Sequence, residues 1–347
     1  MTSDAILPPE QPVPQPPAIP QPSTIRKVFV GKDGLRAVWS FLIFLLVFAA
    51  LVAIGILIGH LVHPVKQPPK AITEMSLTFA FVNEALLAFA TLLATWIMSK
   101  IERRGRSYGY GGSDRIKRLL SGMCWGLILI SLLVLTLWKG GFLVIERRVI
   151  FGADMFRYGL LWLLAFGLVG VFEESLTRGF LLYTLTRGLA GFYRWAFKTR
   201  HSAALGFWSA ATLLSVVFFL GHTGNPGESP VGLLSVFVAG MFFCLAIWRT
   251  GSIWWAIGMH ATWDWGQSFL FGVADSGLMV QHHLLATHPQ GRPVLSGGTT
   301  GPEGSIFILA VLTLGSLVIL LTLPRGRYYE APAVPDEPQP QPAIAVV

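Results

Sequence analysis

Two glutamates and an arginine lie inside an otherwise apolar stretch, Phe172–Gly179, which reads FEESLTRG. A charged side chain at the centre of a bilayer costs about 2.5–3.5 kcal/mol on insertion scales, so such residues face a protein interior or a watered cavity and usually serve function. Residues i and i+4 share one face of a helix, so we expect Arg178 to pair with Glu174 while Glu173 points elsewhere. The spacing therefore predicts one paired carboxylate and one that is free to do chemistry.

Two other apolar segments carry polar residues. His222 ends the run FFLGH, and His260 and Asp264 are four residues apart in HATWD. Taken singly, each of these three side chains could simply form a hydrogen bond between helices. Taken together with Glu173, Glu174 and Arg178, they would be costly in a membrane unless they face one another.

Such a cluster is suited to hydrolysis by either of two routes. A carboxylate beside two imidazoles can deprotonate a water and stabilise the oxyanion that forms. Alternatively, the same groups could bind a zinc ion that lowers the pKa of the water toward 7. The sequence contains no HExxH, GxSxG or GxGD, which argues against zincins, serine hydrolases and presenilin-like proteases.

The three motifs, in this order on successive apolar segments, resemble those of the CPBP family, which comprises type II CAAX prenyl proteases and bacteriocin-processing (Abi) proteins. The resemblance covers residues 155–272. It implies an intramembrane endopeptidase whose active site lies in a cavity open to water, acting on a protein or peptide that could be lipidated. By this resemblance Glu173 would activate the water, and Glu174 would assist while Arg178 holds it.

The same resemblance implies roles for the remaining residues. His222 and His260 would bind the water and the oxyanion, or ligate a metal, and Asp264 stands where the family has Asn or Asp. Family members are called metalloproteases, but a metal-free, glutamate-driven mechanism has also been argued for the CAAX enzymes. No cofactor is therefore certain, and zinc stays an open alternative.

Composition places the chain among membrane proteins. Of 347 residues, 53% are hydrophobic and 13% charged, and the mean hydropathy is +0.60. The net charge of +8 does not indicate nucleic-acid binding, because the basic residues lie beside apolar spans, where they set orientation and contact anionic lipid. Cys124 and Cys244 lie in separate apolar runs and predict neither a disulfide nor a metal knuckle.

Membrane helices need about 20 largely apolar residues. The sequence predicts an all-α, polytopic membrane bundle of about eight transmembrane helices, at 37–62, 76–99, 118–138, 157–186, 204–221, 231–248, 252–271 and 305–323. Glu84, in the middle of the second span, could be a further site residue or could form a buried hydrogen bond between helices, and the second interpretation is preferred. The fourth span exceeds the length that a bilayer requires, so we expect it to tilt or to begin along the interface.

The basic residues predict the topology. They concentrate in the N-terminal flank, in 100–118, after the fourth and sixth spans and after the eighth, which indicates cytoplasmic N and C termini. Lys139, Arg147, Arg148 and Arg157 run against this pattern. The expected location is a bacterial inner or plasma membrane, in a multi-pass arrangement. Counting along the spans places His222 and His260 at different depths, so either the fifth span is shallower or the cavity opens outward.

The remaining segments complete the predicted organisation. Residues 1–25 and 328–347 are Pro-rich and are expected to be disordered tails. Residues 37–150 hold the N-terminal helices, 155–272 the catalytic core, 273–304 an outer loop and 305–323 the last span. The loop is expected to be a lid or disordered, and its histidines, His282, His283 and His288, are not expected to bind metal.

Two other functions are compatible with the pattern. In a non-catalytic membrane scaffold, the buried charges would lock helices together and the Pro-rich tails would recruit partners. In a proton-coupled transporter, the Glu, His and Asp residues would form a relay. The transporter ranks last, since the sequence shows no paired broken helices and no inverted repeat.

Overall fold

The computed structural model describes residues 28–31, 34–62, 74–103 and 107–324. The chain forms two units, residues 1–36 and 37–347. In the first, strands β1 (Val30–Gly31) and β2 (Gly34–Leu35) form a short antiparallel pair. The predicted tails, 1–25 and 328–347, lie outside the described residues.

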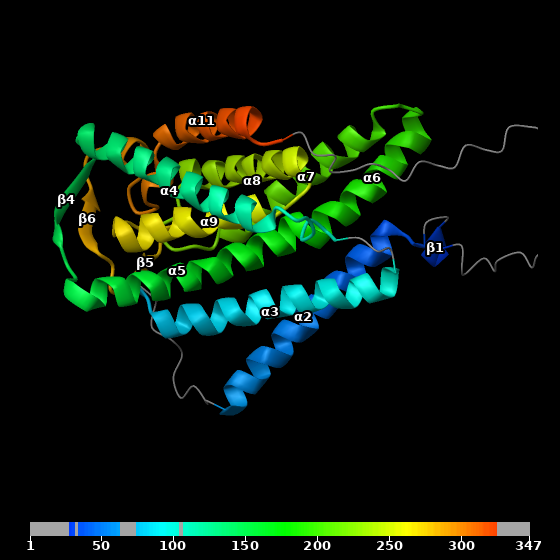
Figure 1. Cartoon of the computed structure of the whole chain (residues 1–347), viewed down its shortest axis with the longest axis horizontal. Coiled ribbons are helices and arrows are strands. Elements are labelled where there is room, and N and C mark those ends of the chain that lie inside the picture. The colour runs from blue at the N-terminus through cyan, green and yellow to red at the C-terminus, as the bar shows by residue number, and fades with distance from the viewer. Residues whose placement is uncertain (1–27, 32–33, 63–73, 104–106, 325–347) are drawn as a thin grey trace, which may run out of the picture. The chain divides into compact units, whose positions relative to one another are not determined.

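The second unit is a helix bundle (Figure 1). Its helices are α2 (Ala37–Val62), α3 (Leu77–Glu102), α4 (Arg115–Lys139), α5 (Gly152–Glu174), α6 (Leu182–Phe197), α7 (Ser202–His222), α8 (Pro230–Thr250), α9 (Trp254–Trp265), α10 (Pro293–Ser296) and α11 (Phe307–Thr322). The expected all-α membrane bundle is confirmed, and each predicted span coincides with a helix. Six helical runs in the described chain are long and apolar enough to cross a membrane, while α9 and α11 are shorter.

The fourth predicted span differs most from the structure, because the helix does not stop near residue 186. A π-helix, η1 (Ser175–Leu181), follows Glu174 and runs directly into α6, so one helical run extends over Gly152–Phe197. Gly179 leaves helical geometry at φ −81°, ψ −110° and marks a kink. π-Helical turns inside α-helices occur frequently at functional sites, and this one begins directly after the two glutamates.

Close backbone contact fixes the position of α9. A β-carbon at Gly258 would lie 2.1 Å from the carbonyl oxygen of Leu119 on α4, and one at Gly122 would lie 2.1 Å from that of Trp255. Only glycine permits such an approach of two helix backbones. The helix that carries His260 and Asp264 is therefore held firmly against α4, and it also packs on α5.

Residues 273–304, predicted to be a loop, form a folded outer segment tied to the bundle. In it, β5 (Met279–Val280) pairs in parallel with β3 (Glu74–Met75), and β6 (Leu285–Pro289) pairs antiparallel with β4 (Leu143–Arg148). A short 3₁₀ turn, η3 (Pro302–Gly304), leads into α11. Figure 1 shows β4 and β6 together at one end of the helices, beside the start of α5.

The three histidines of the outer segment have separate partners. His282 stacks on Tyr158 with ring centroids 4.2 Å apart. His283 Nδ1 lies 2.7 Å from the carbonyl oxygen of Leu285, and His288 Nδ1 lies 2.9 Å from Glu146 Oε1. Each ring thus packs or bonds at a different place.

Candidate active site

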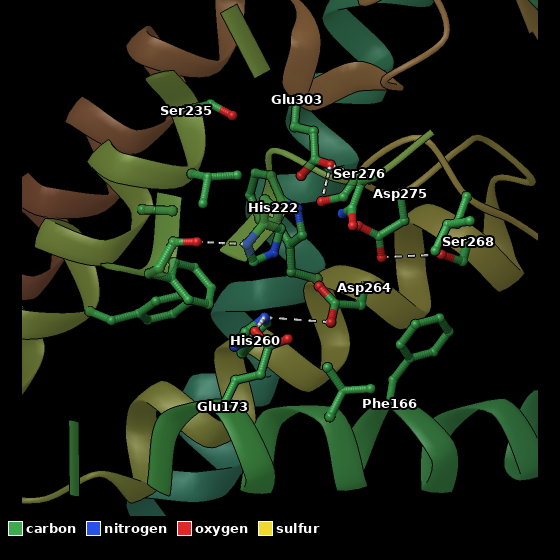
Figure 2. Close-up of a pocket in the computed structure, with 18 of the residues that line it drawn as sticks. Phe166, Glu173, His222, Ser235, His260, Asp264, Ser268, Asp275, Ser276 and Glu303 are labelled. Carbon is green, nitrogen blue, oxygen red and sulfur yellow. Dashed lines mark hydrogen bonds and ion pairs between the residues drawn. The ribbon is translucent and has the colours of Figure 1, made fainter. Parts of the chain in front are cut away.

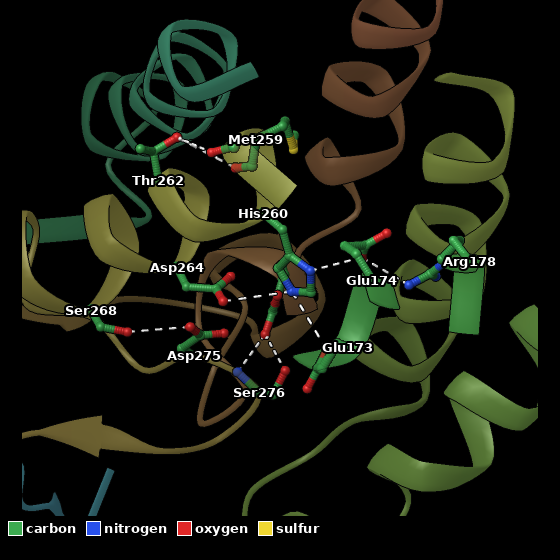
Figure 3. A network of polar contacts seen from close by, with 12 residues as sticks. Glu173, Glu174, Arg178, Met259, His260, Thr262, Asp264, Ser268, Asp275 and Ser276 are labelled. Carbon is green, nitrogen blue, oxygen red and sulfur yellow. Dashed lines mark hydrogen bonds and ion pairs between the residues drawn. The ribbon is translucent and has the colours of Figure 1, made fainter. Parts of the chain in front are cut away.

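His260 is the centre of a polar network formed by α5 and α9 (Figure 3). Its Nδ1 lies 2.9 Å from Glu174 Oε1. Its Nε2 lies 3.6 Å from both Glu173 Oε2 and Asp264 Oδ2. Because a carboxylate can only accept, Nδ1 carries a proton that it donates to Glu174. Nε2 is then the ring atom presented to the other two carboxylates.

Arg178 lies behind this network. Its Nη1 donates to Glu174 Oε1 across 2.9 Å, and the two side chains are 1% and 0% exposed. The guanidinium also lies over the rings of Phe218 and Phe243, 4.5 and 5.3 Å from their centroids. The pairing expected from the i+4 spacing is present, and it buries Glu174. Glu173, at 21% exposed, is the glutamate that reaches open space.

A cavity of about 200 Å³ opens in front of His260 (Figure 2). Four of the six residues expected at the site line it, namely Glu173, His222, His260 and Asp264. His222 Nδ1 lies 2.9 Å from the carbonyl oxygen of Phe218. Although counting along the spans placed the two histidines at different depths, both line this one cavity.

The cavity also contains acidic residues that the motifs did not indicate. Glu84 of α3 lines it, and its Oε1 accepts from its own neighbour Asn83 across 2.7 Å. The expectation of a hydrogen bond to another helix is therefore wrong, because Asn83 on the same helix supplies the donor. No periodic signal marks such a residue as belonging to a site.

Asp275 and Glu303 reach the cavity from the outer segment. Ser268 Oγ donates to Asp275 Oδ2 across 3.3 Å. The backbone N–H of Ser276 donates to Glu303 Oε1, as does its hydroxyl, which lies 2.9 Å away. We call Asp275, Ser276 and Glu303 the acidic roof. Sequence reasoning missed it because acidic residues in a Gly-rich loop normally lie in solvent.

The donor geometry does not fit a zinc site. Among the residues that the structure describes, no three or more His, Cys, Asp or Glu side chains are arranged to hold a metal ion. The Nδ1 contacts of His260 and His222 leave Nε2 of each ring free, as in metal-bound histidines, so the misfit lies in the lack of a third ligand within reach among these described residues. We therefore derive no step through a metal.

Burial gives Glu303 a pH-dependent effect on stability. Desolvation, followed by the charge of Asp275, raises the pKa of Glu303 from 4.5 to about 8. The folded state thus binds this proton more tightly than the unfolded chain does. The resulting stabilisation is complete below the unfolded pKa near 4.5 and is lost as the pH rises through about 8.

We therefore expect Glu303→Gln to leave the melting temperature in detergent nearly unchanged at pH 5. At pH 9 it should raise that temperature by a few degrees over the wild type, because the amide needs no proton to stay neutral. The matched control is Glu146→Gln, which removes a half-exposed carboxylate. A Glu303→Gln curve parallel to the wild type from pH 5 to 9 would contradict the assignment.

The comparison with known protein families covers the segment that holds all six expected site residues. Residues 155–266 match the model of the Rce1-like family, described as type II CAAX prenyl endopeptidase Rce1-like. No curated protein and no solved structure matches the chain. The resemblance recognised from the three motifs is confirmed. Residues 155–266 of the chain are thus similar to the Rce1-like family of type II CAAX prenyl endopeptidases.

Proposed function

We propose that this chain is an intramembrane endopeptidase that hydrolyses a peptide bond with a water activated by Glu173. One observation carries the proposal. Three helices bring four of the site residues to a single cavity, namely Glu173, His222, His260 and Asp264. The buried Glu174–Arg178 pair contacts His260 through Glu174 and holds it in place. A general base, an oriented imidazole and its orienting carboxylate are the parts that acyl transfer to water requires.

The contacts suggest a division of roles. Glu173, the carboxylate open to the cavity, takes a proton from the water as its oxygen attacks the substrate carbonyl. His222 donates its Nδ1–H to the Phe218 carbonyl, so its Nε2 can accept from that water and orient it. The proton on Glu173 then passes to the leaving nitrogen as the C–N bond breaks.

His260 is placed to stabilise the oxyanion. With Nδ1–H donated to Glu174, the protonated ring directs its Nε2–H toward the cavity. Asp264 Oδ2, 3.6 Å from that nitrogen, holds the ring orientation. Glu174 is in turn fixed by Arg178, so these two residues act through His260 and do not touch the substrate.

The family match supports a protein or peptide substrate. We propose further that the substrate could be a lipidated or apolar C-terminal segment, as in CAAX processing. The apolar helices fit a multi-pass integral membrane protein. A bacterial inner or plasma membrane with both termini cytoplasmic remains our proposal for its location and orientation.

The direct test is hydrolysis by the purified protein in detergent. We would offer a fluorogenic peptide library that includes prenylated C-terminal peptides, in water enriched in ¹⁸O, with and without a chelator. We expect cleavage, one ¹⁸O atom in the new carboxyl group, and no effect of the chelator. If a well-folded preparation cleaves none of these peptides, the scaffold function gains over the peptidase; loss of cleavage with the chelator would overturn the metal-free mechanism.

A further inference from the structure

The wall of the catalytic cavity is strongly unbalanced in charge. Among the described residues that line it there is no Lys or Arg, and the protonated ring of His260 is already bonded to Glu174. Arg178, beside it, is already bonded to Glu174 and almost fully buried. Carboxyl groups, in contrast, come from five residues: Glu84, Glu173, Asp264, Asp275 and Glu303.

Three of these carboxyl groups lie outside residues 155–266, the segment that matches the family. Two of the three, Asp275 and Glu303, belong to the acidic roof and accept hydrogen bonds from Ser268 and Ser276, respectively. Their orientation is thus fixed before any substrate arrives, which reduces the entropy cost of recognition. The roof is a feature of this chain that the family match does not supply.

Burial makes these roof carboxyls costly to ionise in the empty cavity. Desolvation raises the pKa of Asp275 well above its usual value, and nearby Asp264 raises it further, with Glu173 also contributing and His260 acting in the opposite sense. Glu303 faces Asp275 and Glu228, and its pKa is likewise raised. A cation brought into the cavity would relieve this repulsion, whereas another anion would add to it.

Another part of the cavity lining is apolar. It is formed by Val236, Ala239 and Phe243 of α8 and by Ile308 and Leu312 of α11. A lysine or arginine side chain matches both surfaces, because its methylene stem packs on apolar groups while its charged head reaches a carboxylate.

We propose that the acidic roof selects substrates by charge, accepting a lysine or arginine side chain close to the scissile bond. The inference rests on the peptidase function and names its substrate class. Asp275 is assigned to contact the cationic head of the substrate side chain, and the carboxyl group of Glu303 adds to the attraction. The chain would then cleave a peptide with a basic side chain near the scissile bond faster than a matched peptide with an uncharged side chain there.

The test is a positional scan with matched peptides. In one fluorogenic decapeptide, each position in turn carries lysine, the uncharged isostere norleucine, or glutamate, and kcat/KM is measured at pH 7 and low ionic strength. We expect lysine to exceed norleucine by about tenfold or more at one position, and glutamate to fall below both. At that position, Asp275→Asn and Glu303→Gln should each bring the lysine-to-norleucine ratio toward one. Glu146→Gln removes the same charge outside the cavity and should keep the wild-type ratio.

Binding of the same labelled peptides is followed in parallel by fluorescence anisotropy. This measurement tests charge selection by the roof separately from the peptidase function. Cleavage with no preference at any position, or a ratio that survives both roof substitutions, overturns charge selection and leaves the peptidase intact. Lysine-selective binding with no cleavage overturns the peptidase and upholds the roof. If the protein shows neither cleavage nor lysine-selective binding, both the peptidase function and charge selection are overturned.

Discussion

Glu173→Gln should lower kcat/KM for any cleaved peptide by about 10²–10⁴-fold, the usual contribution of a general base. The amide has the shape of the carboxylate but cannot take the proton of the attacking water. Glu173 is 21% exposed, and its Oε2 lies 3.6 Å from His260 Nε2, so the substitution removes no fully buried ion pair. We therefore expect loss of turnover with peptide binding largely retained.

The matched control for this variant is Glu84→Gln. Glu84 lines the same cavity from another helix, and its carboxylate accepts from Asn83, a bond that glutamine can still accept. We expect less than a tenfold change in kcat/KM and, in both variants, a melting temperature within a few degrees of the wild type. Substantial activity in a folded Glu173→Gln protein would remove Glu173 from the base role.

Local spacing predicted the parts of the site that depend on a single helix. The i+4 rule anticipated the contact between Arg178 and Glu174, and it placed His260 and Asp264 on one face. The cost of charge in hydrocarbon then implied that these helices converge, and the residues do line or back one cavity. A sequence alone therefore predicts contacts within one helical turn, and it predicts that charged side chains avoid the lipid.

Other features depend on contacts between distant segments, which no local period encodes. Asp275 and Glu303 reach the cavity because strand pairing and the hydrogen bond from Ser276 to Glu303 hold the outer segment over it. The π-helix after Glu174 and the kink at Gly179 lie where α5 passes into α6. Hydropathy marks one apolar helical run over Gly152–Phe197 and does not show where its direction changes.

Arg178→Met should be the most destabilising single substitution at the site, because it removes the guanidinium from the buried carboxylate of Glu174 and leaves that carboxylate with His260 alone. Breaking a buried pair in this way costs about 3–5 kcal/mol. Both side chains are almost completely buried, so water cannot replace the guanidinium. We expect a large fall in stability in detergent, measured by thermal or SDS-induced unfolding.

A double substitution separates charge from packing. In Arg178→Met/Glu174→Gln the buried charge is gone, the methionine can still contact Phe218 and Phe243, and the glutamine oxygen can still accept from His260 Nδ1. Stability should therefore recover by a large part of the loss, since apolar replacement of both partners of a buried pair is often neutral. Arg178→Lys keeps the charge but loses the planar guanidinium that stacks on the two rings, so it should fall between the wild type and Arg178→Met. If the double variant is no more stable than Arg178→Met, the arginine acts chiefly through its packing on the aromatic rings, and Glu174 does not need a cation to remain buried beside His260.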